Sequence, residues 1–291
     1  MTRPFMFVLT LLIMAAAVTP AAAQAPADPA PAETAAAANA AAQDDDPDRD
    51  PNAAQPDFYV ATLNTTLRLP TRAWNFRLTH RFTTPLDEGD GGDLFGRLFG
   101  LDGGALVGLD LKYGLFPGFD IGIYRTSFDR TIQLQGRYNL IRDGNGPFGL
   151  SLVANVDGTD NFTDEYSPGV AIVVSRELGD RGAIYFQPSY VGNSDLIGDD
   201  DEDEDYTVMA GLGARLRFGR NSYVFVEGSP RIAGFDAGAD LISFGFEQRY
   251  GGHVFQLNFS NGFGTTLAQV ARSGAGADNW YLGFNLARKF F

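Results

Sequence analysis

The sequence predicts an all-β fold, a transmembrane antiparallel up-and-down β-barrel of about 12 strands, with about 14 strands as the alternative. Three observations predict it: apolar and polar residues alternate over long segments, charged residues occupy the polar face, and short turns alternate with long connections. In 131–140, Ile132 and Tyr138 fall on one face while Gln133 and Arg137 fall on the other. Such segments run for roughly ten to thirteen residues, whereas strands in soluble sandwiches have about 5–6 and membrane-crossing strands about 9–11.

Charged residues lie between apolar neighbours on the polar faces of these segments. A water-filled lumen can pair and hydrate such charges, whereas the hydrocarbon of a bilayer cannot. We therefore expect the charged faces to line the lumen, which favours a barrel over a soluble β-sandwich. The candidates for lumen-lining charges are Arg77, Arg81, Asp110, Lys112, Arg137, Arg215, Arg217, Glu227, Glu247 and Arg249.

The composition excludes several other classes of protein. The chain has 291 residues, no Cys and a formal net charge of −14. Without thiols it has no disulfide framework, Cys-ligated zinc, iron–sulfur cluster or cysteine nucleophile. An acidic chain also lacks the basic surface that nucleic acid requires, so no nucleic-acid partner is expected.

The N-terminal part is expected to serve targeting and tethering. Residues 1–23 have the layout of a secretory signal peptide, because Arg3 precedes an apolar run over 5–14 that leads into small residues. Residues 24–57 consist almost entirely of Ala, Pro, Asp, Gln and Asn, so we expect a disordered periplasmic linker. The barrel is then expected over 58–291, in the outer membrane of a Gram-negative bacterium.

Candidate strands follow one another along the whole barrel region. Clusters of Gly, Pro, Asn and Asp mark tight turns between them, at 117–118, 143–146, 179–182, 219–221 and 251–252. The candidate strands are 57–69, 74–85, 103–115, 119–128, 131–142, 147–156, 167–178, 183–193, 205–218, 222–233, 239–250, 252–262 and 279–290.

The lengths of the connections decide the number of strands. If the last strand ends on the periplasmic side, every tight turn faces the periplasm and every long connection faces outward, which is the known asymmetry of these barrels. On that register 74–290 closes as about 12 strands, because bacterial single-chain barrels have an even number. The segment 57–69 is then a periplasmic or lumen-entering piece, or the first of about 14 strands if 265–272 supplies another. The long connections are 86–102, 157–166, 194–204 and 263–278.

Aromatic residues gather near the ends of the candidate strands. This resembles the aromatic girdles at the two interfaces of a membrane barrel, although a sandwich core would use many of the same rings. The residues are Trp74, Phe82, Tyr113, Phe116, Phe148, Tyr185, Tyr223, Tyr250, Trp280 and Phe290.

The C-terminal segment 280–291 resembles the insertion strand of outer-membrane proteins, which alternates hydrophobic residues and ends in an aromatic one. In this chain Phe290, rather than the terminal Phe291, keeps the register, and Arg288 interrupts the apolar face. The resemblance implies outer-membrane lipid and, through 280–291, the barrel-assembly machinery as partners.

Residues 58–291 also resemble an uncharacterised family of bacterial membrane-bound β-barrels, known only as a domain of unknown function. The family carries no assigned chemistry, so the resemblance implies the fold and the location but no substrate. The matching pieces are 79–82, 94–96, 98–102, 124–127, 131–134 and 260–266.

No residue pattern predicts catalysis or a cofactor. Outer-membrane lipases and deacylases use a Ser activated by a His, often as His-x-Ser, but Arg81 and Phe82 follow His80, and Val254 and Phe255 follow His253. The glycines follow turns and strands and form no phosphate-binding loop. We expect no enzymatic activity and a structural role for His80.

An acidic run is the candidate for metal binding. Its carboxylates suit hard cations such as calcium, but it lacks the spaced ligands and the turn glycine of an EF-hand. A solvated external loop is therefore the favoured interpretation. The residues are Asp199, Asp200, Asp201, Glu202, Asp203, Glu204 and Asp205.

Three functions remain open, and the first is favoured. The polar, mixed-charge lumen predicts a passive, porin-like channel for small polar solutes, unless its charge pairs cross-link it shut. A structural or adhesive barrel would instead bind a partner through outer loops such as 86–102. Uptake of hydrophobic solutes, suggested by 24 Phe residues, ranks last because lipid-facing belts explain most of them.

Overall fold

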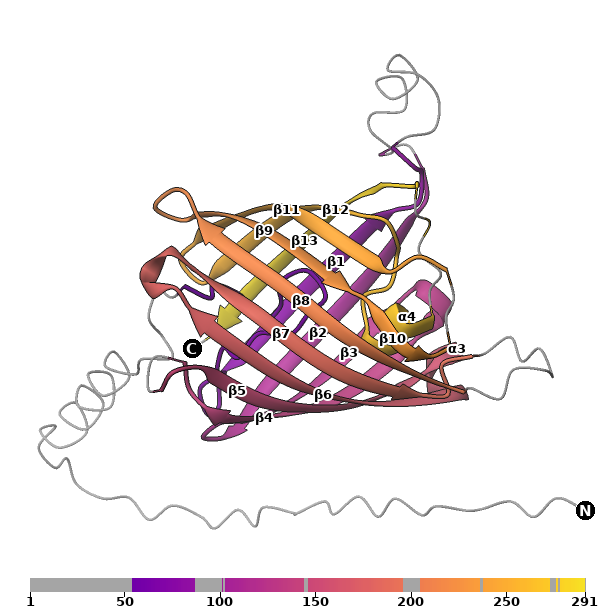
Figure 1. The fold of residues 1–291 in the computed structure, drawn as a ribbon, viewed down its shortest axis with the longest axis horizontal. Helices are drawn as coiled ribbons and strands as arrows, with labels where there is room; N and C mark the ends of the chain where they lie inside the picture. Colours follow the sequence, from indigo (N-terminus) through magenta and orange to yellow (C-terminus); the bar gives the residue numbers. More distant parts are fainter. Residues whose placement is uncertain are drawn as a thin grey trace, which may run out of the picture. The chain divides into compact units, whose positions relative to one another are not determined.

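The computed structural model describes residues 54–86, 101, 103–143, 146–195, 205–235, 238–272, 276 and 278–290. The segments predicted as signal peptide and most of the predicted linker lie outside these residues. All described residues belong to one compact unit, 46–291. This unit is a closed antiparallel β-barrel (Figure 1).

The barrel has twelve transmembrane strands, which confirms the smaller of the two predicted numbers. Neighbours in sequence are neighbours in the sheet, β1 pairs with β13, and β8 pairs with β9, so the sheet has no open edge. The short β10 continues β9 along β8 after Pro230, whose ring nitrogen has no hydrogen to donate. The strands are β1 (Trp74–Phe82), β2 (Ala105–Phe116), β3 (Phe119–Thr126), β4 (Ile132–Ile141), β5 (Gly149–Gly158), β6 (Asp164–Glu177), β7 (Gly182–Gly192), β8 (Tyr206–Arg217), β9 (Ser222–Ser229), β10 (Arg231–Gly234), β11 (Leu241–Tyr250), β12 (His253–Ser260) and β13 (Tyr281–Phe290).

Successive side chains point alternately outward and into the lumen. On β11, Ile242, Phe244 and Phe246 are exposed on the outer wall, whereas Glu247 and Arg249 are buried inside. An apolar outer wall is what a lipid environment requires, and a polar inner wall is possible because the barrel closes on itself.

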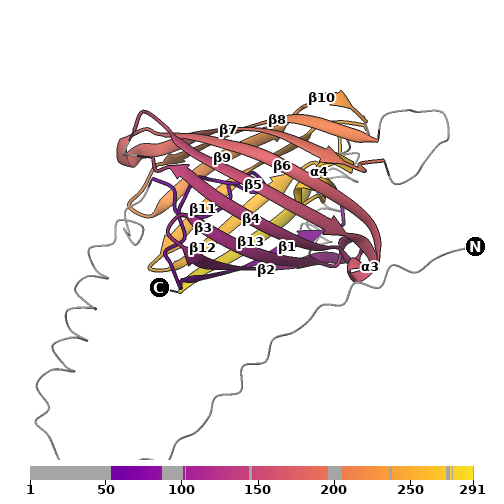
Figure 2. The ribbon, with the colours of Figure 1, turned by 90° about the horizontal axis from the view of Figure 1, so that it is seen from below.

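The two ends of the barrel differ in their connections. Tight turns lie at the end that carries the C-terminus, here called the turn end, and Gly118 and Gly251 occupy two of them with positive φ. The opposite end, here called the loop end, carries the longer connections, as Figures 1 and 2 show. Short helices are η3 (Phe128–Arg130), α3 (Thr159–Phe162) and α4 (Leu267–Arg272) at the loop end, and η4 (Gly179–Arg181) at the turn end.

Within the described residues, no helix has the length and apolar character needed to cross a membrane.

The predicted aromatic girdle is correct only in part. Trp74, Phe116 and Tyr250 are exposed on the outer wall, but Tyr185 and Tyr223 are buried in the lumen. The correction follows from the period of two, because odd-numbered residues of β7 and β9 point inward.

Candidate functional site

The N-terminal segment 54–69, here called the plug, lies inside the barrel and joins β1 through 70–73 (Figure 1). It turns back on itself through hydrogen bonds from the Val60 N–H to the Leu63 carbonyl, 2.8 Å, and from the Thr65 N–H to the Phe58 carbonyl, 2.9 Å. Its only bridge pairing is Tyr59 with Asn64, so it is no transmembrane strand. The lumen-entering alternative for 57–69 is therefore observed.

Burial begins before the predicted end of the linker at 57. Ala54, Gln55 and Asp57 are buried, and the Gln55 amide donates to the Glu177 carboxylate on β6 at 3.0 Å. The last residues of the predicted linker therefore belong to the plug. Sequence reasoning missed this because these side chains are small or polar and their partners lie far away in the sequence.

The Glu227 carboxylate on β9 holds the turn of the plug. Its oxygens accept hydrogen bonds from the backbone N–H groups of Ala61 and Thr62 at 2.8 Å, and of Leu63 at 3.1 Å. The Thr62 hydroxyl donates to the same carboxylate at 2.6 Å. Consecutive N–H groups that converge on one anion form a backbone nest. Glu227 is 2% exposed, so these charge-assisted bonds are shielded from water.

Arginines of the wall hold the carbonyl groups of the plug. Arg215 donates to the Tyr59 carbonyl at 2.7 Å and Arg77 to the Ala61 carbonyl at 2.9 Å. Side-chain amides do the same, since Asn139 donates to the Thr66 carbonyl at 3.0 Å. The wall thus satisfies several backbone groups of the plug, which has almost no regular structure.

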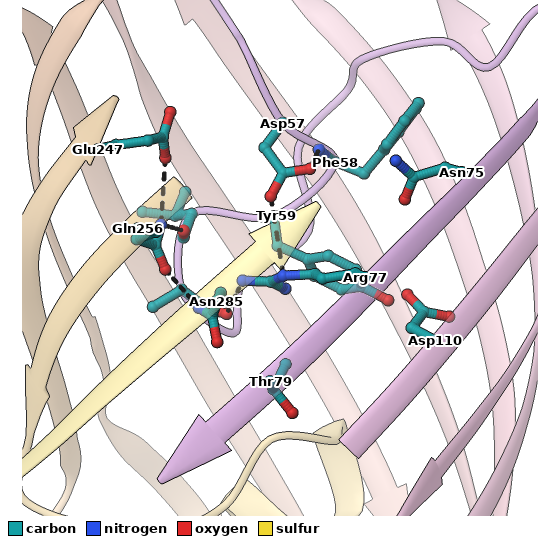
Figure 3. A network of polar contacts seen from close by, with 12 residues as sticks. Asp57, Phe58, Tyr59, Asn75, Arg77, Thr79, Asp110, Glu247, Gln256 and Asn285 are labelled. Carbon is teal, nitrogen blue, oxygen red and sulfur yellow. Dashed lines mark hydrogen bonds and ion pairs between the residues drawn. The ribbon is translucent and has the colours of Figure 1, made fainter. Parts of the chain in front are cut away.

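The aromatic rings of the plug lie against wall cations. The guanidinium of Arg77 lies 4.5 Å and the ammonium of Lys112 lies 4.8 Å from the centre of the Tyr59 ring. Asp57 adds a carboxylate 3.7 Å from the Arg77 guanidinium, in the network that Figure 3 shows. Cation–π contacts of this kind are stabilising when they are desolvated.

The described ion pairs of the wall join residues of the same strand or of nearby strands and do not cross the lumen. Asp120 and Arg137 pair at 2.8 Å from directly opposed positions on β3 and β4, and Lys112 pairs with Asp110 of its own strand at 3.7 Å. Arg215 on β8 reaches Glu247 on β11 at 2.9 Å. The plug, and not ion pairs across the lumen, therefore occupies this half of the barrel in the described part of the chain.

The predicted lumen-lining charges all lie on the inner face, and most are deeply buried. Arg217 differs, because it lies at the rim of the turn end and pairs with Asp180 of η4. Asp120 and Lys289 also face inward and were not singled out from the sequence. Asp120 lies on the polar face of the alternating segment 119–126. The same alternation identified the other lumen-lining charges, so it could also have identified Asp120.

The helix α4 occupies the lumen toward the loop end. Its apolar side chains, including Val270, pack against Met209 and Leu241 of the wall. The Arg231 guanidinium donates to the carbonyls of Val270, 3.0 Å, and Ala271, 3.2 Å, near its C-terminal end. The alternative of a strand over 265–272 is therefore wrong, because 267–272 form a helix whose Ala268, Val270 and Ala271 are buried.

Polar contacts cover the other side of α4. Gln269 donates to the Thr131 hydroxyl at 3.2 Å, and the Thr266 hydroxyl donates to the Asp157 carboxylate. A cavity of about 20 Å³ between Leu63 of the plug and α4 is large enough for about one water. On the outer side of α4, a vestibule of about 820 Å³ opens at the loop end.

The two histidines lie on the strands β1 and β12. His80 points outward and stacks on Phe284 with ring centres 4.7 Å apart, and His253 begins β12 at the turn end. No described hydrogen bond joins a serine to either ring. Among the described residues no group of three potential metal ligands occurs, and of the acidic run only Asp205 is described. Likewise only Leu86 and Leu101 of the loop 86–102 are described.

The closed sheet, its apolar outer wall and its polar lumen define an outer-membrane β-barrel. The family model named membrane bound beta barrel domain (DUF5777) matches residues 57–290, and the chain belongs to this family. No curated protein matches the chain in sequence.

Solved structures of similar fold include porins and enzymes. A KdgM porin in complex with disordered oligogalacturonate matches with TM-score 0.47 and 7% identity, over 75% of this chain and 99% of the porin. Outer membrane phospholipase A from Escherichia coli matches with TM-score 0.40 and 13% identity, over 81% of this chain and 95% of the phospholipase. LpxR from Salmonella typhimurium matches with TM-score 0.36 and 11% identity, over 75% of this chain and 99% of LpxR. Similarities this distant assign no activity to the chain.

Proposed function

We propose that this protein is an outer-membrane channel for small polar solutes that its own plug closes, and that it conducts when the plug is displaced. The observation that carries the proposal is the capture of Ala61, Thr62 and Leu63 by the wall carboxylate of Glu227. A gated channel takes the place of the passive channel expected from the sequence. The reason is that the buried plug lies in the lumen, with a cavity of about 20 Å³ between it and α4.

The polar contacts of the plug are of a kind that water can replace. The described part of the plug joins the barrel covalently only through 70–73, and the chain has no cysteine to tie it elsewhere. A typical hydrogen bond contributes only about 0.5–1.5 kcal/mol net because water competes for both partners. Displacement of the plug therefore exchanges partners and leaves the barrel strands paired.

The wall behind the plug suits a hydrated passage. Its inward residues include Asn75, Gln135, Ser151, Gln187 and Asn285, all buried and polar. Barrels of about 8 strands are filled by their own side chains, and barrels of about 16–18 strands enclose an aqueous channel. Twelve strands lie between these sizes, which fits a lumen that one inserted segment can close.

The helix α4 has a different role in this proposal. Its apolar face is packed on the wall and its C-terminal carbonyls are held by Arg231. It therefore stays in place as a constriction when the plug leaves, and limits the channel to small solutes.

The substitution Glu227→Gln tests the proposal. It keeps the size of the side chain but replaces one accepting oxygen with an NH₂ group that faces the N–H donors of the plug. Hydrogen bonds to a charged group are each worth about 1.5–3 kcal/mol, so we expect the open probability to rise about tenfold or more. Single-channel recording in planar bilayers measures this, with the wild-type protein closed for most of the recording.

The matched control is Asp120→Asn. Asp120 is a buried lumen carboxylate that accepts a hydrogen bond from Arg137 at 2.8 Å and makes no described bond to the plug, and Arg137 keeps its own bond to the Thr65 carbonyl of the plug at 3.3 Å when Asp120 is changed. Its substitution should lower the stability of the barrel without opening it. If Glu227→Gln stays as silent as the wild type, the gated channel is wrong, and the alternative of a non-conducting structural or adhesive barrel takes its place.

The positions of the phenylalanine side chains argue against the uptake of hydrophobic solutes. Phe186, Phe244, Phe246 and Phe255 are exposed on the outer wall, where lipid would contact them. The lumen wall is polar, which favours polar solutes.

A further inference from the structure

We infer that the opened lumen selects anions, with small organic carboxylates as its solute class. The inference rests on the proposed function, because only displacement of the plug exposes the surface concerned. That surface is a row of inward cations on β1, β11 and β13, here called the cationic row: Arg77, Arg81, Arg249 and Lys289.

Cations outnumber carboxylates on the wall around the plug. Each of these side chains points into the lumen, and nearly all are less than a tenth exposed. The cations are Arg77, Arg81, Lys112, Arg137, Arg215, Arg249 and Lys289, and the carboxylates are Asp110, Asp120, Asp157, Glu177, Glu227 and Glu247.

Pairing divides the cations into two groups. Lys112, Arg137 and Arg215 have partners in the wall, namely Asp110, Asp120 and Glu247. No carboxylate of the described wall lies within ion-pair distance of a member of the cationic row. Arg81 instead donates to the Asn285 amide oxygen at 2.9 Å, and the ion-pair partner of Arg77 is Asp57 of the plug.

The cationic row extends from the turn end along most of β1 toward the loop end. Lys289 is level with Asn75 in the pairing of β13 with β1, and Arg77 and Arg81 follow along β1. At about 3.3 Å per residue, the path from the level of Asn75 to Arg81 covers about 20 Å. Arg249 is level with Arg77, because Val254 and Ala287 pair in the strands between them.

The plug presents electron-rich groups to this wall. Arg77 contacts the Ala61 carbonyl, the face of the Tyr59 ring and the Asp57 carboxylate. Lys289 lies 5.4 Å from the centre of the Phe58 ring. Without the plug these cations lose their acceptors, and an anion in transit would replace them. Guanidinium groups favour carboxylates because two parallel N–H groups match two oxygens.

A plug substitution that leaves the wall charges intact provides the open channel for the test. Thr62→Pro removes both the N–H and the hydroxyl that Thr62 donates to Glu227. In planar bilayers with a KCl gradient, we expect chloride to permeate at least about three times as well as potassium. Millimolar succinate should reduce the chloride current by competition, whereas the uncharged succinamide should not.

Two adjacent residues of β13 give a matched pair of variants in the Thr62→Pro background. Lys289→Gln removes an inward cation and should bring the permeability ratio toward one. Arg288→Gln removes an outward cation, which lies 4.6 Å over the Phe290 ring, and should leave the ratio unchanged. Circular dichroism establishes that each variant is folded, and Glu227→Gln serves as a second way to open the channel.

The outcomes separate this inference from the proposed function. If both opening variants are folded and silent, the gated channel and the anion selectivity are both wrong. If they conduct with equal permeability or with a preference for potassium, the proposed function stands and the inference is overturned. A loss of selectivity in Arg288→Gln equal to that in Lys289→Gln would also overturn it.

Discussion

Neighbouring residues in this barrel have opposite environments, and the role of a side chain depends on a register of one residue. Arg288 lies on the outer wall against the Phe290 ring, whereas the next residue, Lys289, points to the Phe58 ring in the lumen. Glu227 likewise points inward to the plug, while Val226 before it is exposed on the outer wall. The charges that hold the plug are therefore placed by strand register alone.

The glycine at 114 allows the plug to join the wall. A Cβ atom at this position would lie 2.1 Å from the Pro70 carbonyl oxygen, in the connection between the plug and β1. We expect Gly114→Ala to destabilise the protein by about 1–3 kcal/mol, because backbone must move to make room. Urea unfolding in detergent measures this.

Gly136→Ala is the control for that substitution. A Cβ atom at 136 would have its nearest neighbour 3.7 Å away, in the Phe119 ring on the outer wall, so its effect should be small. Equal losses of stability in the two variants would contradict the account of the plug connection.

Strands are the elements that the sequence predicts well, because their period of two is imposed by lipid on one side and a polar lumen on the other. The expected 131–142 is observed as β4 over Ile132–Ile141, and 205–218 as β8 over Tyr206–Arg217. The plug and α4 escape this reasoning. Segment 57–69 has partners on strands far along the chain, and six residues are too few to display a helical period.

The anchoring of α4 gives a prediction at the level of this element. Arg231→Gln removes the donors to the Val270 and Ala271 carbonyls, so α4 should move more freely at the loop end. In the Thr62→Pro background we expect a larger single-channel conductance than with Thr62→Pro alone. The difference is measured as single-channel conductance in roughly 1 M KCl. At this salt concentration the effects of distant charges are screened, so the conductance reports mainly the width of the passage. An unchanged conductance would mean that α4 is not the constriction.

The whole molecule combines a wall that the sequence predicts with a lumen content that it does not. The closed barrel of twelve strands follows from alternation and turn signals, and its location follows from the family to which the chain belongs. The predicted lumen charges are on the inner wall, but their partners in the plug are set by tertiary contacts that no local pattern records. Asp57 is the example, because it reads as linker in the sequence and lies 3.7 Å from Arg77 in the fold.

A reversible disulfide between the plug and the wall tests whether the plug closes the barrel. The hydroxyls of Thr66 in the plug and Ser175 on β6 are in contact, and the chain has no other cysteine to interfere with an engineered pair. The matched control is Ser243→Cys with Ser260→Cys, which joins two wall residues whose hydroxyls lie 3.1 Å apart.

The decisive measurement is the single-channel current of Thr66→Cys/Ser175→Cys/Glu227→Gln before and after reduction. We expect a silent channel when the disulfide is formed and an open one after reduction, with no such change in the wall-to-wall control. Current that flows equally through the oxidised and reduced protein would contradict the claim that the plug closes this barrel.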